Sequence, residues 1–215
     1  MGVIKRQSIK GTIYSYIGTV IGFVTAGLLF PKFLSTERIG LLSLVASYST
    51  LFAVFGNLGF NSVVLRLFPY FRDESRQHHG FFALTAIVTA CGYLLSILLF
   101  FLLKPLIIKD SIEQSPLFVE YLYLVPFLTF FLLVYAIFDS YNRALFNATY
   151  GTFLTEVFQR FTILVLILLF IAGVTGFHGF ALLYTGALCL PGLLIFYPLI
   201  IKKQVFFRTE FSFVD

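Results

Sequence analysis

Residues 81–103 read FFALTAIVTACGYLLSILLFFLL, an apolar stretch without a single charged side chain. At about 1.5 Å per residue, a helix of this length covers the roughly 30 Å hydrocarbon core of a bilayer. Apolar runs of about 18 residues or more indicate membrane spans, because buried helices and strands of soluble domains carry shorter ones. The stretch therefore predicts that lipid, and not water, is the solvent of this segment.

The same pattern recurs outward from this stretch in both directions. The apolar runs are residues 13–30, 41–65, 81–103, 117–138, 153–173 and 180–201. The first is too long for a signal-peptide core and is read as a span. Overall, 59% of the residues are hydrophobic and 12% charged, against about 25% charged in soluble domains. The sequence predicts an all-α membrane protein, a bundle of six transmembrane helices.

Helix-breaking residues lie where loops between the runs are required. They are Pro31, Pro69, Gly80, Pro105, Pro116, Gly151, Gly176 and Gly179. Pro126 and Pro191 lie inside runs, where a missing backbone N–H is expected to kink the helix.

The connecting segments carry Lys and Arg unevenly, and cytoplasmic loops of membrane proteins hold the excess of these residues. If the chain crosses the membrane six times, ten of these Lys and Arg residues lie on one side of the membrane and four on the other. The first set is Lys5, Arg6, Lys10, Arg66, Arg72, Arg76, Arg143, Lys202, Lys203 and Arg208, and the second is Lys32, Arg38, Lys104 and Lys109. Both termini are therefore predicted to be cytoplasmic. The net charge of +5 forms no basic stripe with interleaved aromatics, so nucleic acid is not an expected partner.

The first run carries two rows of small residues at four-residue spacing. These are Gly11, Ser15 and Thr19, and Gly18, Gly22 and Ala26. Such rows let membrane helices approach closely. The alternative is that glycines are merely common in membrane helices.

Glu156 and Arg160 are ionisable residues inside the fifth run. They are one helical turn apart with the acid first, which is the favourable order for an ion pair. An ionisable residue at the bilayer centre costs about 3 kcal/mol on insertion scales, so it usually faces a bundle interior or a wet cavity. The two interpretations are a structural ion pair and the lining of a hydrophilic cavity.

The end of the second run is also polar. Helical spacing puts Asn57 and Asn61 on one face, with Arg66 about a turn further on. Arg66 either lines a cavity or extends to the lipid head groups, whereas the two amides need partners inside the bundle. Asp139, Asn142 and Arg143 close the fourth run in a similar way and are interpreted as a boundary feature.

No catalytic or metal site is expected. Cys91 and Cys189 lie inside apolar runs, and His78 and His79 are predicted to lie on the opposite membrane face from His178. Nucleophile–base pairs and ligand clusters therefore lack members on a common face, and no phosphate-binding glycine loop is present. The sequence favours a protein that is not an enzyme.

Three stretches resemble a known family. Residues 4–12 (IKRQSIKGT) resemble the start of Wzx-type polysaccharide flippases, which belong to the multidrug/oligosaccharidyl-lipid/polysaccharide exporter superfamily. Residues 33–42 (FLSTERIGLL) and 59–72 (GFNSVVLRLFPYFR) resemble the first loop and the second-span end of that family. The resemblance extends more loosely over the chain, which is similar to one six-helix lobe of a MATE-like flippase.

The resemblance implies a transporter of the bacterial cytoplasmic membrane that moves lipid-linked oligosaccharide to the outer leaflet for polysaccharide or O-antigen export. Two lobes alternate access to a cationic cavity, so the implied substrate-binding residues are Arg66 and Arg160, with Glu156, Asn57 and Asn61 beside them. Family members have two such lobes joined by a cytoplasmic linker, which residues 202–215 would begin. The resemblance therefore implies a second lobe or a second copy as partner, besides membrane lipids.

Two alternatives stay open. One is an exporter of the same superfamily with another cargo, lipid II or a drug; the other is a membrane scaffold without transport. No cofactor is expected, and sodium and protons are both open as the coupling ion.

Overall fold

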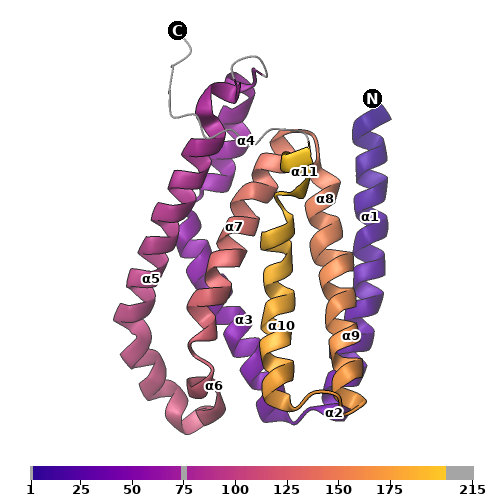
Figure 1. Cartoon of the computed structure of the whole chain (residues 1–215), viewed down its shortest axis with the longest axis vertical. Helices are drawn as coiled ribbons and strands as arrows, with labels where there is room; N and C mark the ends of the chain where they lie inside the picture. The colour runs from indigo at the N-terminus through magenta and orange to yellow at the C-terminus, as the bar shows by residue number, and fades with distance from the viewer. Residues whose placement is uncertain (1, 74–76, 202–215) are drawn as a thin grey trace.

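The computed structural model describes residues 2–73 and 77–201, and in this part of the chain helices and turns are present without β-strands. Six helices are long and apolar enough to cross a membrane (Figure 1). They are Lys5–Phe33, Thr36–Asn57, Phe81–Ser111, Leu124–Ala144, Ala148–Ile171 and Phe177–Ile201. The predicted fold class, an all-α membrane bundle of six helices, is confirmed.

The helical elements follow one another with short connections. The first span consists of α1 (Gly2–Gly22), the π-helix η1 (Phe23–Leu29) and α2 (Phe30–Phe33). Then come α3 (Thr36–Asn57), α4 (Phe60–Phe71), the 3₁₀ turn η2 (Gln77–Gly80), α5 (Phe81–Gln114), α6 (Pro116–Glu120) and α7 (Leu124–Ala144). The last segments are α8 (Ala148–Thr152), the π-helix η3 (Phe153–Gln159), α9 (Arg160–Ile171), α10 (Phe177–Leu194) and α11 (Tyr197–Ile201).

The described chain begins and ends at the same end of the bundle. The start of α1 lies at the end that also holds α4, α8 and α11, and α2 and α6 lie at the opposite end (Figure 1). This arrangement agrees with an even number of crossings. The predicted linker at 202–215, with Lys202, Lys203 and Arg208, lies outside the described residues, and so does Arg76.

Helix α7 forms the centre of the bundle. It packs against α3, α4, α5, α8 and α10. In its apolar stretch 61% of the residues are buried inside the protein, against 17% in that of the first span. The peripheral helices leave large apolar side chains exposed, such as Leu94, Leu98 and Phe101 on α5. In a membrane protein such faces contact lipid chains, and the lipid, not the protein interior, shields these side chains from water.

The second predicted span, 41–65, is interrupted. Helix α3 ends at Asn57, and α4 begins at Phe60 after Leu58 and Gly59, both of which adopt left-handed backbone angles (φ 49° and 74°). Glycine adopts this conformation at little cost, and a left-handed residue ends a helix by turning the next peptide away from the axis. Asn57 and Asn61 therefore flank a break, and do not share a face of one continuous helix.

Prolines interrupt the helices less than predicted. Helix α5 continues through Pro105 to Gln114, and Pro69 lies within α4. Pro126 lies in the first turn of α7, where the backbone N–H has no helical partner to lose. The expected kink at Pro126 is therefore replaced by a helix start, and the loop expected at Pro105 begins only after Gln114.

Candidate functional site

The fifth span carries an ion pair where the sequence predicts one. Nη2 of Arg160 lies 2.8 Å from Oε2 of Glu156, and Nη1 of Arg160 donates to the carbonyl of Gly18 at 3.0 Å. The side chains are 38% and 28% exposed for Arg160 and Glu156, so neither charge is sealed in the core. The guanidinium therefore links the fifth span to the first and keeps part of its surface accessible.

The pair lies deep in the membrane. The fifth span runs over 24 residues from Ala148 to Ile171, and Arg160 lies close to its midpoint. Gly18 lies equally close to the midpoint of the first span, Lys5–Phe33. This is deeper than the sequence predicts, because the span begins five residues before the predicted start at Phe153. A charge at this depth is tolerated only beside a partner or a polar cavity.

Two glycines of α1 make the contact with the pair. A Cβ atom on Gly18 would collide with the backbone and the carboxylate of Glu156, and one on Gly22 would collide with Nη1 of Arg160. Only glycine lets the two helices approach this closely. The predicted row of Gly18 and Gly22 is thus a packing face, whereas Gly11 of the other predicted row meets no atom within 4 Å.

Hydroxyl groups gather on an exposed face of α1, within two turns of Gly18. Thr12, Ser15, Tyr16 and Thr19 line a shallow hollow there. Thr12 and Thr19 donate to the carbonyls of Ser8 and Ser15 one turn earlier, so their hydroxyls remain close to the helix and keep acceptor capacity. The other predicted row of small residues is therefore a polar face.

A separate hollow of about 160 Å³ lies further along the first span. Its lining comes from the first, fifth and sixth spans and consists of Gly22, Thr25, Ala26, Phe30, Arg160, Ile163 and Tyr184. Arg160 lines this mostly apolar hollow, whereas the hydroxyl-lined hollow is formed by residues of α1 alone. A cation next to an apolar surface suits an amphiphilic ligand with an anionic group.

Both spans at this contact contain π-helix. Segment η3 carries Glu156 and ends directly before Arg160, and η1 follows Gly22. Elements α1 and η3 pack on each other, as do η1 and α9. π-Helical turns are rare and recur at functional sites, because they shift side chains out of the regular register. No signal in the sequence predicts them.

The remaining predicted site residues lie elsewhere. Arg66 is exposed on α4, which packs on α7, whereas Arg160 is next to α1. Helix α4 lies at one end of the bundle, whereas Arg160 lies near the middle of the fifth span (Figure 1). Oδ1 of Asn57 accepts a bond from the backbone N–H of Asn61 at 3.3 Å, so the side chain of Asn57 bridges the break between α3 and α4. The structure brings Arg160 and Glu156 together, but not Arg66.

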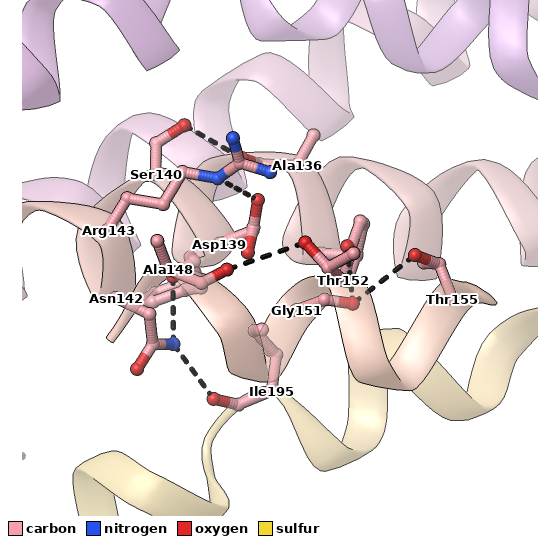
Figure 2. Close-up of polar contacts among 12 residues, drawn as sticks. Ala136, Asp139, Ser140, Asn142, Arg143, Ala148, Gly151, Thr152, Thr155 and Ile195 are labelled. Carbon is pink, nitrogen blue, oxygen red and sulfur yellow. Dashed lines mark hydrogen bonds and ion pairs between the residues drawn. The ribbon is translucent and has the colours of Figure 1, made fainter. Parts of the chain in front are cut away.

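The end of α7 holds a buried polar group that the sequence suggested was a boundary feature. Asp139 and Asn142 are 6% and 1% exposed, and Nε of Arg143 donates to Oδ2 of Asp139 at 2.7 Å (Figure 2). Nδ2 of Asn142 donates to the carbonyls of Phe138 and Ile195, which ties α7 to the end of α10. Only Arg143 extends outward, as expected at a membrane boundary.

Metal chemistry has no ligand set in the part of the chain that the structure covers. Within residues 2–73 and 77–201, no group of three or more His, Cys, Asp and Glu side chains could hold a metal ion.

Comparison with known proteins gives no match to a family model, a curated protein or a solved structure. The chemistry of the site is therefore that of one cation, one carboxylate and a row of hydroxyls.

Proposed function

We propose that this chain is a flippase-type transporter that moves lipid-linked oligosaccharide across the bacterial cytoplasmic membrane for polysaccharide or O-antigen export. It works by alternating access with a second six-helix lobe, supplied by a longer chain or by a second copy. The resemblance of residues 4–12, 33–42 and 59–72 to Wzx-type flippases supports the family. The geometry around Arg160 supports the site.

The observation that carries the proposal is the accessible guanidinium at mid-depth of the membrane. Arginine has five N–H donors, and the contacts with Glu156 and Gly18 leave others for a ligand. A guanidinium matches the oxygen geometry of phosphate, and the low dielectric of the membrane strengthens the interaction. Arg160 is therefore proposed to meet the pyrophosphate, with Glu156 holding it in place when no substrate is bound.

The polar face of α1 is the proposed path for the sugar. The hydroxyls of Thr12, Ser15 and Thr19 are exposed at membrane depth, where lipid chains offer them no hydrogen bonds. Hydroxyl groups suit the hydroxyls of a sugar. The apolar hollow beyond Arg160 would then receive the start of the lipid chain.

The proposed orientation follows from charge. At the end where α1 begins, the described cations are Lys5, Arg6, Lys10, Arg66, Arg72 and Arg143, and the described acids are Asp73 and Asp139. At the other end the cations Lys32, Arg38, Lys104 and Lys109 are accompanied by the acids Glu37, Asp110 and Glu120. We therefore propose that the end with α1, α4 and α8 is cytoplasmic.

A second candidate function, a membrane scaffold without transport, is favoured by one observation. Both charges of the Glu156–Arg160 pair are satisfied inside the protein. On that account the pair only holds the first and fifth spans together, and losing either charge harms folding more than export.

Export in a flippase-deficient strain separates the two functions. The complete gene is expressed with Arg160→Ala or with Lys109→Ala, which removes an exposed cation at the far end of α5. At equal membrane abundance, transport predicts that Arg160→Ala lowers export at least about tenfold, the cost of one charged hydrogen bond, and that Lys109→Ala does not. Full export by Arg160→Ala contradicts the site. Failure of the wild-type gene to restore export, together with loss of abundance in Arg160→Ala, supports the scaffold.

A further inference from the structure

Asp139 is a buried carboxylate with only one of its two oxygens paired. Its Oδ2 accepts from Nε of Arg143, whereas Oδ1 has no hydrogen-bond partner within the described chain. A carboxylate oxygen left without donors in a low-dielectric interior costs free energy comparable to a lost hydrogen bond or more. The side chain of Arg143 is 48% exposed, so it does not separate the buried carboxylate of Asp139 from water. The unpaired oxygen therefore needs an explanation.

The surroundings of Oδ1 fit a proton better than a metal ion. A Cβ atom on Gly151 would collide with Oδ1, so the backbone of α8 stands directly against this oxygen. A cation bound by oxygen ligands needs room among them, whereas a proton needs none. Glycine at 151 is what allows the carboxylate to approach α8 at all.

Tyr135 offers the acceptor for such a proton. Its hydroxyl donates to the carbonyl of Gly151 at 3.1 Å, and its oxygen has two lone pairs, so it keeps acceptor capacity beside the hydroxyl of Thr155. A Cβ atom on Gly151 would lie 3.2 Å from this hydroxyl oxygen and would collide with Oδ1 of Asp139. Oδ1 and the hydroxyl of Tyr135 therefore both lie next to Gly151 of α8.

The other ionisable groups near this contact are engaged elsewhere. Along the fifth span, the hydroxyl of Tyr150 donates to the carbonyl of Leu194, and Glu156 pairs with Arg160. On α7 itself, the side chain of Tyr141 is buried. The ionisable side chains of the helices packed on other faces of α7 are Arg66 and Tyr70 on α4, Glu37, Arg38 and Tyr48 on α3, Cys91, Tyr93, Lys104, Lys109 and Asp110 on α5, and His178, Tyr184 and Cys189 on α10. None of these described residues forms a hydrogen bond or an ion pair with Asp139. Arg143 is thus the charge that acts directly on Asp139.

We propose that Asp139 is a proton-binding site whose proton ties α7 to α8. A proton taken from water binds Oδ1, and the new O–H group donates to the hydroxyl oxygen of Tyr135, which donates in turn to the carbonyl of Gly151. Oδ2 continues to accept from Arg143. Loss of the proton restores the charge and leaves Oδ1 without a donor, so the contact between α7 and α8 loosens. This inference does not rest on the proposed transport.

Infrared spectroscopy of the full chain in lipid bilayers tests the proposal, because a protonated carboxyl has a C=O stretching band that carboxylates lack. Spectra are recorded from about pH 6 to about pH 9, a range in which exposed carboxyls are almost fully ionised. The wild-type protein is expected to show this band at the acidic end and to lose it as the pH rises. Asp139→Asn should abolish the band, and Glu156→Gln should retain it.

Tyr135→Phe provides the second criterion. It leaves the carboxyl in place and removes its proposed acceptor, so the band should persist at a shifted frequency. The proposal is overturned if the wild-type protein shows no titrating band, if Asp139→Asn retains it, or if Tyr135→Phe leaves its frequency unchanged.

Discussion

Gly22 lies against the guanidinium of Arg160, so the first span meets the fifth span at the charge itself. A side chain at this position would occupy the place of Nη1, which in turn donates to the carbonyl of Gly18 one turn earlier. The absence of a side chain at Gly22 and the position of the partly exposed Arg160 cation are therefore two parts of one contact. A substitution of Gly22 should therefore disturb Arg160, and a substitution of Arg160 should disturb the packing at Gly22.

Alanine at Gly18 or Gly22 should destabilise the protein. The added methyl group collides with Glu156 or Arg160, and overpacking of this kind costs about 1–3 kcal/mol. The matched control is Gly11→Ala on the same helix, which meets no atom within 4 Å and should be neutral or slightly stabilising. Reversible unfolding in mixed micelles, followed by circular dichroism, measures the difference. Equal effects of all three substitutions would contradict the contact.

The Glu156–Arg160 pair should behave as a coupled unit. Glu156→Gln leaves the cation without its partner, and Arg160→Met leaves the acid without its own, so the double variant should lose less stability than the two single variants added together. Both side chains are partly exposed, which limits the expected coupling to about 1 kcal/mol. A double-mutant cycle of unfolding free energies gives this value directly. Additive effects would show that the 2.8 Å contact contributes nothing.

Asn142→Ala should cost about 1–3 kcal/mol of unfolding free energy. It removes the two bonds to the carbonyls of Phe138 and Ile195 and leaves the latter buried without this donor. Asn147→Ala is the control, because the Asn147 side chain makes no capping bond at the start of α8. Thermal unfolding in detergent compares the two. A larger loss for Asn147→Ala would refute the tie between α7 and α10.

Cysteine labelling should reveal the proposed orientation. In a chain with Cys91→Ala and Cys189→Ala, a membrane-impermeant maleimide added to intact spheroplasts should label Lys109→Cys and not Lys10→Cys. Both positions are exposed and lie toward opposite ends of the bundle. Permeabilised membranes should label both. The opposite pattern would place the end with α1, α4 and α8 outside.

Much of the fold follows from run length alone, because the cost of placing polar groups in lipid leaves few ways to arrange six apolar runs. The interruption at Leu58 and Gly59 does not follow, since a left-handed leucine leaves no mark in hydropathy. The same holds for Pro105, where residues further along α5 continue the helix. The ends of the helices depend on the backbone conformation of a few residues, and tertiary packing decides that conformation.

The candidate site is predicted in part. The four-residue spacing of Glu156 and Arg160 predicts their pairing, since neighbours one turn apart share a face. The contact of Arg160 with Gly18 does not follow, because it joins residues that are 142 positions apart. The two rows of small residues in the first run have the same spacing, yet one packs and the other is exposed. Only the position of the fifth span distinguishes them.

The most direct test of the account is whether the polar face of α1 meets water. Ser15→Cys and Thr19→Cys lie on that face, and Val20→Cys lies on an exposed apolar face of the same helix at similar depth, where Val20 is 65% exposed. In bilayers, with Cys91→Ala and Cys189→Ala present, a small charged thiol reagent should modify Ser15→Cys and Thr19→Cys and leave Val20→Cys intact, since the thiolate that reacts forms in water. If all three cysteines are equally unreactive, the face meets lipid, and the proposed hydrophilic path is wrong.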